Sequence, residues 1–391
     1  MFKDVFIVSG VRTAVGSFGG SLKDKSADEL AAAVIKEAVN RSGADIYDVD
    51  EVVMGCVGQY GMNAFLARTA ALKAGCPVES TAQTVNRMCS SGLQAIVTAA
   101  MEIDHGDLEI CVAGGAESMS NFPYMSYGTR FGARLGDTVL VDGLSCALAE
   151  PLTGEHISST AENIAEKYSL TRENLDAYSL MSQQRAKKAI ADGKFTEEII
   201  PVEVKMKKEV RIFDTDEHPR DTNMEKLGKL KPLYKKDGVV TAGNASGIND
   251  GAAAVVVMSG EALRQRGITP LVQIVDYAVA GVDPSVMGLG PVYSTQKLLK
   301  KCGLDVKDID LWELNEAYAA QALACIKELK IDINKVNVNG SGISLGHPIG
   351  ATGAIISIKL INEMYRRDAQ YGVAALCIGG GQGLSVLYKR V

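Results

Sequence analysis

Two residues of this 391-residue chain each combine a reactive side chain with neighbours that would expose and activate it. Cys89 lies in Asn86-Arg-Met-Cys-Ser-Ser-Gly, just before a predicted helix whose free N–H groups and dipole favour a thiolate and can stabilise an oxyanion. His347 lies in the glycine- and proline-rich loop 340–353, before another predicted helix, where an imidazole can serve as the base for a thiol. A buried structural cysteine and a histidine in an ordinary turn are the alternative interpretations.

A third thiol and an amide occupy the ends of two predicted strands. Cys377 precedes Gly379-Gly-Gly-Gln-Gly, whose glycines let a ligand approach the backbone N–H groups closely. These glycines do not form a nucleotide motif, because no Lys-Ser/Thr follows them and no G-x-G-x-x-G occupies a strand-to-helix turn. Asn315 and Glu316 follow a buried strand, at the edge where α/β sheets bind ligands. A structural role for Cys377 and helix capping by Asn315 are the alternatives.

The remaining histidines and one basic segment carry weaker signals. His156 is expected to line a substrate entrance, whereas His105 and His218 lie in charged surroundings and are expected to be solvated. Segment 205–236 holds ten Lys and Arg against six Asp and Glu. Such a segment is either a phosphate-binding surface or, more commonly, a solvated charged face.

Composition excludes several classes of protein. Forty-one Lys and Arg against 47 Asp and Glu give a net charge of −6, which argues against a general binder of nucleic acid or of acidic membranes. None of the eight cysteines forms a C-x-x-C pair, so neither a zinc site nor a redox disulfide is expected. The N-terminus does not resemble a signal peptide and no apolar run reaches membrane-spanning length. The expected compartment is the cytoplasm.

The order of predicted elements occurs twice along the chain. The first unit begins with a strand at Val5–Ser9 and a helix capped by Ser26-Ala-Asp-Glu29, and the same order begins again after Leu271. The second unit includes a short strand at Val336–Val338. In the first unit the last strand, Ala252–Met258, is delayed by an insertion. Alternating strands and helices predict an α/β fold with mostly parallel sheets.

The repeat divides the chain into three regions. The first half spans 1–118 and is completed by 250–270, an inserted domain spans 119–249, and the second half spans 271–391. The insertion has its own composition and elements and is expected to form a functional layer over the sheets. Its helical stretch is expected to break near Tyr168–Thr171.

Four motifs resemble the active-site motifs of the thiolases and occur in the order of that family. They are Asn86-Arg-Met-Cys-Ser-Ser-Gly-Leu-Gln-Ala, Asn315-Glu-Ala-Tyr-Ala-Ala-Gln, Gly346-His-Pro-Ile-Gly-Ala-Thr-Gly and Cys377-Ile-Gly-Gly-Gly-Gln-Gly. Segments around Arg12, Gly115 and Thr241 are also similar to thiolase segments, so the resemblance runs through the chain. It implies duplicated βαβαβαββ halves in α/β/α/β/α layers, with an inserted loop domain that binds coenzyme A (CoA).

The resemblance also implies a two-step exchange of acyl groups between CoA thioesters. Cys89 would take the acyl group with His347 as its base, and Cys377 would deprotonate acetyl-CoA for Claisen condensation or protonate the enolate in thiolysis. A soft nucleophile and a second base fit this chemistry. His347 and a water on Asn315 would form one oxyanion hole, and the N–H groups of Cys89 and Gly379 the other.

Acetyl-CoA, acetoacetyl-CoA and CoA are the implied substrates and products, with no separate cofactor and no metal. The residues implied to contact the substrate are His156, Arg220, Ser246 and Tyr318, of which Arg220 lies in the basic segment. Ketosynthases and hydroxymethylglutaryl synthases share the doubled fold but lack the cysteine that is Cys377 here, so the resemblance favours the thiolases.

Substrate range and assembly depend on less specific features. Short-chain members usually carry Met at the position of Ile157 and Phe at the position of Tyr318, which leaves the acyl-chain length open. Loop Phe122–Asp137 resembles the tetramerisation loop of short-chain thiolases and implies a homotetramer, a dimer of dimers. The expected activity is that of an acetyl-CoA C-acetyltransferase in fatty acid metabolism. The alternatives are a 3-ketoacyl-CoA thiolase of broader range, a thiolase-like acyl-CoA-binding protein without turnover, and a Cys/His hydrolase.

Overall fold

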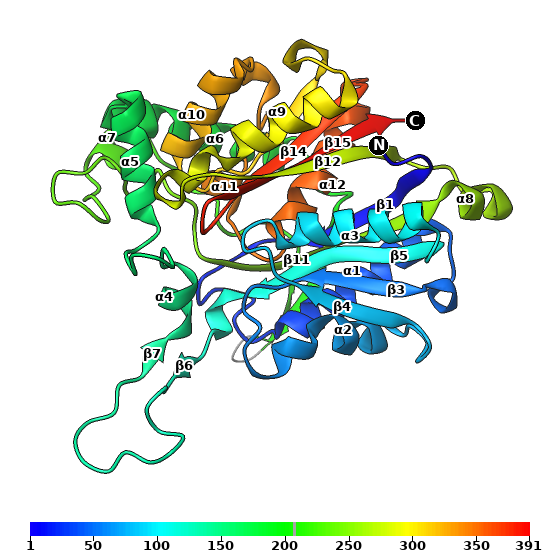
Figure 1. Cartoon of the computed structure of the whole chain (residues 1–391), viewed down its shortest axis with the longest axis horizontal. Coiled ribbons are helices and arrows are strands. Elements are labelled where there is room, and N and C mark those ends of the chain that lie inside the picture. The colour runs from blue at the N-terminus through cyan, green and yellow to red at the C-terminus, as the bar shows by residue number, and fades with distance from the viewer. Residues whose placement is uncertain (206–208) are drawn as a thin grey trace.

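The computed structural model describes residues 1–205 and 209–391 (Figure 1). Residues 206–208, which belong to the basic segment 205–236, lie outside the described residues. Figure 1 shows two stacked groups of strands with helices around and between them, and the two chain ends lie near each other.

The N-terminal group of strands has the order β1-β11-β5-β3-β4. β11, which follows the insertion in sequence, pairs antiparallel with β1 on one side and with β5 on the other. β3 runs parallel to both β4 and β5. The bounds are β1 Val5–Thr13, β3 Glu51–Gly55, β4 Thr81–Val85, β5 Ile110–Ser118 and β11 Asn249–Ser259.

The C-terminal group repeats this arrangement in the order β13-β14-β15-β12. β15 pairs antiparallel with β12 and with β14, and β13 runs parallel to β14. A short antiparallel contact between β1 and β12 links the two groups at Phe6 and Gln273 into one continuous sheet. The bounds are β12 Val272–Gly281, β13 Leu311–Leu314, β14 Tyr371–Ile378 and β15 Gln382–Arg390.

The expectation of mostly parallel sheets is wrong. Among the described residues, parallel pairs join β3 to β4 and β5, β13 to β14, and β1 to the short β8, whereas the long central strands pair antiparallel. The last two strands of the chain are joined by a turn of only three residues, Gly379–Gly381, and such a short connection forces an antiparallel pair. The sheet is therefore mixed.

Helices cover both outer faces and fill the space between the two groups of strands (Figure 1). α1 and α2 pack on the N-terminal strands, and α9 and α10 pack on the C-terminal strands. α3 and α12 share one apolar cluster with strands of both groups. The layers alternate α/β/α/β/α, as the resemblance implied. The bounds are α1 Ala27–Ser42, α2 Leu66–Ala74, α3 Ser91–His105, α9 Gly290–Cys302, α10 Ala319–Leu329 and α12 Thr352–Arg366.

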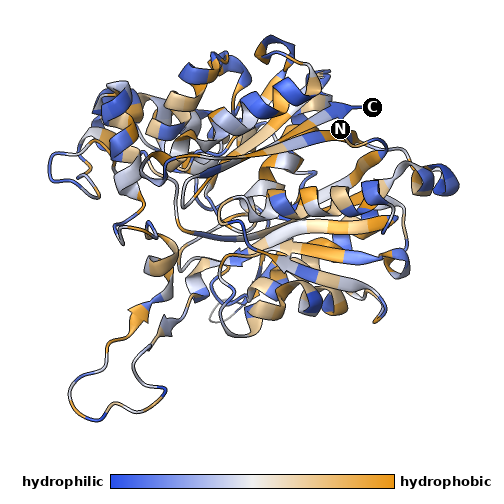
Figure 2. Ribbon diagram, in the orientation of Figure 1, coloured by the Kyte–Doolittle hydropathy of each residue, from blue (hydrophilic) through white to orange (hydrophobic). Residues whose placement is uncertain are grey.

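Local sequence explains where α1 begins, ends and packs. Ser26 is its N-cap, and Glu29 completes the predicted capping box. Gly43, with φ of 81°, ends the helix in the left-handed region that glycine adopts readily. The buried side chains, among them Leu30 and Val34, recur at helical spacing and face the sheet. Figure 2 shows the same pattern throughout, with apolar colour on the strands and polar colour on the outer helices.

The predicted strand at Val336–Val338 does not form. Val336 makes a single bridge to Trp312, and Asn337 has a φ of 48°. That left-handed backbone cannot continue a strand. Instead, the Asn337 side chain hydrogen-bonds both the N–H and the carbonyl of Leu314, at 2.9 and 2.7 Å, and so supports the end of β13.

The segment between β5 and β11 lies mostly beside the two groups of strands (Figure 1), but its β8 pairs with β1 in the main sheet. Its long helices break where expected, because Ser169 adopts φ of 53° and ends α5 before α6 begins. A long loop extends from it between β6 and β7 and exposes Phe131 and Leu135 almost completely. The bounds are β6 Tyr124–Met125, β7 Val141–Asp142, α4 Gly143–Ala147, α5 Ser158–Tyr168, α6 Arg172–Ala191, β8 Ile199–Ile200, β9 Val202–Lys205, β10 Val210–Phe213 and α7 Met224–Gly228.

Three further short elements lie in the two halves of the chain. They are β2 Gly16–Ser17, α8 Gly260–Arg266 and α11 Gly342–Leu345. Within the described part of the chain, no helix has both the length and the apolar character needed to cross a bilayer.

Candidate active site

The two central helices bring the Cys89 loop and the His347 loop together. Cys89 lies just before α3, and His347 lies just before α12. The helices approach each other backbone to backbone, because a Cβ on Gly353 would overlap the backbone of Leu93 and a Cβ on Gly92 would crowd the carbonyl of Gly350. Glycine at these two positions therefore allows the two loops to meet.

The thiol of Cys89 faces backbone donors but sits in surroundings of low polarity. Burial raises the pKa of Cys89 to about 11, although N–H groups of Gly379 and of Cys89 itself act to lower it. The charge of Glu117 raises it further. The expectation that the helix N-terminus favours a thiolate is wrong for the site without substrate, because desolvation of the thiol raises its pKa more than the backbone N–H groups lower it. Cys89 therefore needs a base.

His347, in the loop that packs against the start of α3, is the candidate for that base. The residue is 4% exposed, and burial lowers its pKa to about 4, so the ring is neutral at physiological pH. Its Nδ1 lies 2.6 Å from the Thr352 hydroxyl. That hydroxyl donates its single proton to the Pro348 carbonyl, at 2.9 Å, so it accepts a hydrogen bond from Nδ1–H. The Nε2 atom thus carries the free lone pair.

Asn315 also indicates that Nε2 is the unprotonated nitrogen of His347. Its Nδ2 lies 3.4 Å from His347 Nε2 and donates to it. Its Oδ1 is buried with no partner, so the amide offers an acceptor to a water or substrate group. α10 begins at Ala319 with Tyr318 as its N-cap, which excludes the capping role for Asn315.

Glu316 fixes the turn that carries Asn315. Its carboxylate accepts hydrogen bonds from Tyr178 Oη at 2.9 Å, Ser182 Oγ at 2.7 Å and Asn337 Nδ2 at 3.0 Å. A buried carboxylate with this many donors is rigidly held. Glu316 therefore holds the neighbouring Asn315 in place, and its own carboxylate is occupied by these donors.

Cys377 is the penultimate residue of β14, and its thiol lies near that of Cys89. It is fully buried, and burial together with the nearby Cys89 raises its pKa well above the usual value for a thiol. Gly380 and Gly381, with φ of 84° and 87°, form the turn that follows, and this turn presents the Gly379 N–H toward Cys89. The two thiols and one backbone donor thus face the same space.

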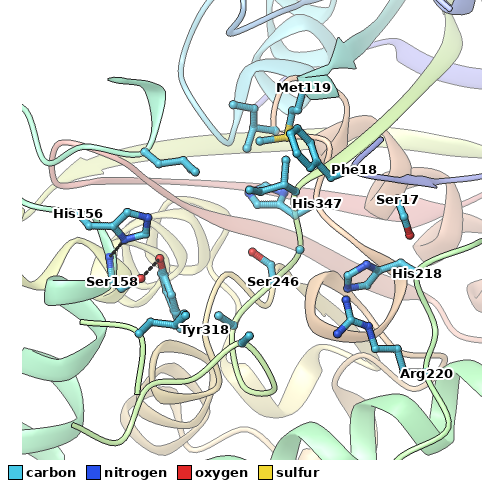
Figure 3. Close-up of a pocket in the computed structure, with 17 residues that line it drawn as sticks. Ser17, Phe18, Met119, His156, Ser158, His218, Arg220, Ser246, Tyr318 and His347 are labelled. Carbon is cyan, nitrogen blue, oxygen red and sulfur yellow. Dashed lines mark hydrogen bonds between the residues drawn. The ribbon is translucent and has the colours of Figure 1, made fainter. Parts of the chain in front are cut away.

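A cavity of about 460 Å³ leads to this chemistry (Figure 3). Its lining includes His347 and all four residues implied to contact substrate, which are His156, Arg220, Ser246 and Tyr318. Its apolar lining and few polar groups are typical of a small-molecule site. The His347 loop and the segment between β5 and β11 therefore both line one pocket.

His218 corrects a sequence expectation. It is buried rather than solvated, at 7% exposure, and it lines the same cavity. Burial and the nearby Arg220 lower its pKa to about 4. Its Nδ1 lies 3.3 Å from Asn249 Nδ2. By contrast, His105 is exposed, as expected.

Sequence reasoning missed Asn249, which holds the base loop. The amide is fully buried, donates to the Gly16 carbonyl at 3.0 Å and accepts from the His347 N–H at 2.9 Å. Gly346, with φ of 100°, packs so tightly on it that a Cβ would collide with the amide. Asn249 and Thr352 both lie inside or beside segments that resembled thiolase motifs, but only their contacts show what they hold.

Comparisons with known proteins match this chain over nearly its whole length. Residues 5–261 match the thiolase N-terminal domain and residues 268–390 the thiolase C-terminal domain. The chain is 49% identical to the beta-ketothiolase BktB of Cupriavidus necator and 50% identical to the acetyl-CoA acetyltransferase of Escherichia coli, with full coverage of both chains in each case. The crystal structure of human mitochondrial 3-ketoacyl-CoA thiolase in complex with CoA is similar with a TM-score of 0.96 and 44% identity, covering 100% of this chain and 98% of that one. The chain therefore belongs to the thiolase family and is an acyltransferase.

Proposed function

We propose that this protein is an acetyl-CoA C-acetyltransferase, which condenses two acetyl-CoA into acetoacetyl-CoA and CoA and catalyses the reverse thiolysis. The observation that carries the proposal is that two thiols, Cys89 and Cys377, lie near each other, with Cys89 packed on the cluster that contains Ile349, and that the neutral imidazole of His347 and Ile349 line the cavity beside them. A hydrolase needs one nucleophile and one base, whereas acyl exchange with carbon–carbon bond formation needs a second base.

In the first step Cys89 attacks the thioester carbonyl of acetyl-CoA. Its proton passes to Nε2 of His347, a C–S bond forms to Cys89, and the bond to the CoA sulfur breaks as His347 returns the proton to that sulfur. The N–H groups of Cys89 and Gly379 stabilise the oxyanion of the tetrahedral intermediate. Because burial raises the pKa of the thiol to about 11, the base is essential to this step.

In the second step the proton of Cys377 passes to Nε2 of His347, and the resulting thiolate removes a methyl proton from the next acetyl-CoA. The enolate oxygen accepts hydrogen bonds from Nε2–H of His347 and from a water on Asn315, and the enolate carbon attacks the acetyl group on Cys89. A C–C bond forms, the Cys89 thioester breaks, and the Cys89 sulfur takes the proton back from His347. A thiol of raised pKa yields a strong base once ionised, which suits the weakly acidic methyl group.

The insertion supplies the CoA side of the pocket. Arg220 lies at the cavity with an exposed guanidinium that can pair with phosphate. His156 and Ser246 also line this cavity, where pantetheine would lie. The relative solved in complex with CoA supports CoA thioesters as the substrates.

A short acyl chain fits the inner end of the pocket best. Tyr318 is buried beside Ile157, Met287 and Cys377 in one apolar cluster, and its hydroxyl lies 3.2 Å from Ser158 Oγ. This wall leaves little room behind the thiols. Thiolysis of acetoacetyl-CoA should exceed that of 3-ketooctanoyl-CoA in kcat/KM, and Tyr318→Ala should reverse part of the preference. Equal rates in the wild type would instead favour a 3-ketoacyl-CoA thiolase of broader range. The chain is similar both to an acetyl-CoA acetyltransferase and to a 3-ketoacyl-CoA thiolase, so the comparisons are compatible with either outcome.

The decisive experiment separates the two thiols. Fresh reduced protein mixed with acetoacetyl-CoA should gain one acetyl group on the peptide that contains Cys89. Cys377→Ala should form this adduct from acetyl-CoA but not from acetoacetyl-CoA and should lose condensation, because it cannot protonate or generate the enolate, whereas Cys89→Ala should form no adduct from either thioester. Cys111→Ala is the control, since Cys111 is an equally buried strand cysteine that lies near the start of β5, away from the site. Unaltered CoA-ester binding with no turnover in the wild type would favour the non-catalytic acyl-CoA-binding protein, and net hydrolysis without CoA products would favour the Cys/His hydrolase.

We also propose that the protein assembles as a homotetramer and acts in the cytoplasm. The loop between β6 and β7 exposes Tyr127, Phe131, Leu135 and Val139, and such an apolar extension is typical of an interface. Light scattering should give the mass of four chains. Phe131→Asp with Leu135→Asp should reduce that mass to two chains, and an unchanged tetramer would contradict the assignment of this loop.

A further inference from the structure

Glu117, near the end of β5, is a fully buried carboxylate to which the proposed mechanism gives no role. Its Oε2 accepts hydrogen bonds from the N–H groups of Val57 at 2.9 Å and Gly350 at 2.8 Å. Its Oε1 accepts from the Gly58 N–H at 2.9 Å and faces the Cys56 thiol at 3.6 Å. All four donors are neutral, and three belong to the backbone. The carboxylate therefore organises chain segments rather than pairing with a cation.

The segments that Glu117 joins come from different halves of the molecule. Val57 lies in the loop after β3, whereas Gly350 lies three residues beyond His347. Val57 and Ile349 belong to one apolar cluster, and Cys89 packs against that cluster. The carboxylate thus ties the wall behind the nucleophile to the loop that carries the base.

The charge of Glu117 also reaches the nucleophile. Burial raises the pKa of Glu117 to about 7, although its three backbone donors act to lower it. The ionised carboxylate raises the pKa of Cys89. Besides Glu117, the pKa of Cys89 is influenced by the N–H groups of Gly379 and of Cys89 itself, and the pKa of Cys377 by Cys89, Cys325 and its own N–H. Removal of the charge should therefore be visible at Cys89 itself.

We propose that Glu117 is a positioning residue for acyl transfer, whose carboxylate holds the His347 loop against the loop after β3 and so fixes the base relative to Cys89. This inference rests on the proposed function, because it assigns Glu117 a role through the groups that carry out that reaction. Hydrogen bonds to a charged acceptor are stronger and more directional than neutral ones, which suits a carboxylate to holding two loops at once.

Two substitutions separate the position of the carboxylate from its charge. Glu117→Asp keeps the charge but is one methylene shorter, so it cannot reach both loops. Glu117→Gln keeps the length but turns an N–H toward a backbone N–H. We expect each to lower kcat by roughly 10- to 100-fold, since a displacement of about 1 Å can cost about 10²-fold. The KM for CoA should change little, because Glu117 does not line the cavity.

The matched control is Glu198→Gln. Glu198 is equally buried, but it accepts from Arg12 at 2.8 Å and Asn362 at 2.9 Å, away from the site. This variant should lower the Tm while retaining kcat. A loss of kcat in Glu117→Asp or Glu117→Gln that Glu198→Gln reproduces at the same Tm would overturn the proposal, because general destabilisation would then explain it.

Alkylation of Cys89 gives a readout that a purely structural role would not move. The rate of iodoacetamide labelling of the Cys89 peptide is measured by mass spectrometry against pH. Its midpoint should fall in Glu117→Gln, which lacks the charge, and stay near that of the wild type in Glu117→Asp. If Glu117→Gln does not fold, the kcat of Glu117→Asp is the test. Wild-type kcat in either folded variant overturns the proposal, whereas a wild-type protein that forms no acetyl-Cys89 refutes the proposed function instead.

Discussion

The substitution Thr352→Val tests how the protein prepares His347 as a base. Valine has the shape of threonine without its hydroxyl, so the packing of α12 is kept while Nδ1–H of His347 loses its partner at 2.6 Å. Moving the proton to Nε2 does not relieve the loss, because Nε2 would then point its N–H at the donor Nδ2 of Asn315, 3.4 Å away. The substitution therefore destabilises the tautomer that has its proton on Nδ1 and its lone pair on Nε2, and the other tautomer offers no relief.

The size of the effect follows from the cost of a buried donor without a partner. That cost is ~1–3 kcal/mol, and each 1.4 kcal/mol is about a factor of ten in rate. We therefore expect kcat for acetoacetyl-CoA thiolysis to fall roughly 5- to 150-fold in Thr352→Val, with KM for CoA close to that of the wild type. Rapid-quench measurement of Cys89 acetylation should show the same fall, because the first proton transfer uses this base.

Thr352→Ser is the matched control, since serine keeps the hydroxyl and removes only a methyl group. It should restore kcat to near the wild-type value. Wild-type kcat in Thr352→Val would refute the tautomer assignment. A loss in Thr352→Ser as large as that in Thr352→Val would show that packing, rather than the hydroxyl, is what matters.

Three further outcomes follow from contacts and burial. Labelling of Cys89 by iodoacetamide in the free enzyme should still rise above pH 9, because burial raises the pKa of this thiol to about 11; a plateau below pH 8 would contradict this. Arg220→Ala should raise the KM for CoA with kcat little changed, whereas Arg211→Ala, in the same segment but outside the cavity, should do neither in a steady-state assay. Arg12→Met should lower the free energy of unfolding in urea by ~3–5 kcal/mol, because it leaves two buried carboxylates unpaired. The exposed ion pair of Arg264 should contribute at most ~1 kcal/mol in the same titration of Arg264→Met.

The features predicted correctly from sequence are those that neighbouring residues encode. The capping box of α1, the break between α5 and α6 and the layered order all depend on short-range pattern. Cys89 and His347 were singled out because glycines, proline and a helix start surround them within a few residues, and their catalytic roles stay predictions. The division into two halves and an insertion stays a prediction.

The errors have long-range causes. His218 has charged neighbours in sequence, but the fold places it against Asn249 and buries it. The pKa of Cys89 was expected from its helix, whereas the whole pocket desolvates it. The parallel sheet was expected from local alternation, whereas β11 enters between β1 and β5 from far along the chain. Local sequence cannot report burial that depends on segments hundreds of residues away.

The same distance explains why the residues that hold the His347 loop were missed. Glu117 and Gly350 are separated by 233 residues, and Asn249 and His347 by 98. Both holding residues lie at the ends of N-terminal-group strands, β5 and β11, while the loop they hold belongs to the C-terminal half. Each half therefore brings a reactive loop, but the first half also fixes the loop of the second. A duplicated domain can specialise in this way only if its copies stay in contact, and the glycine-lined approach of α3 and α12 provides that contact. The reaction geometry is thus a property of the packed pair, and neither half alone contains it.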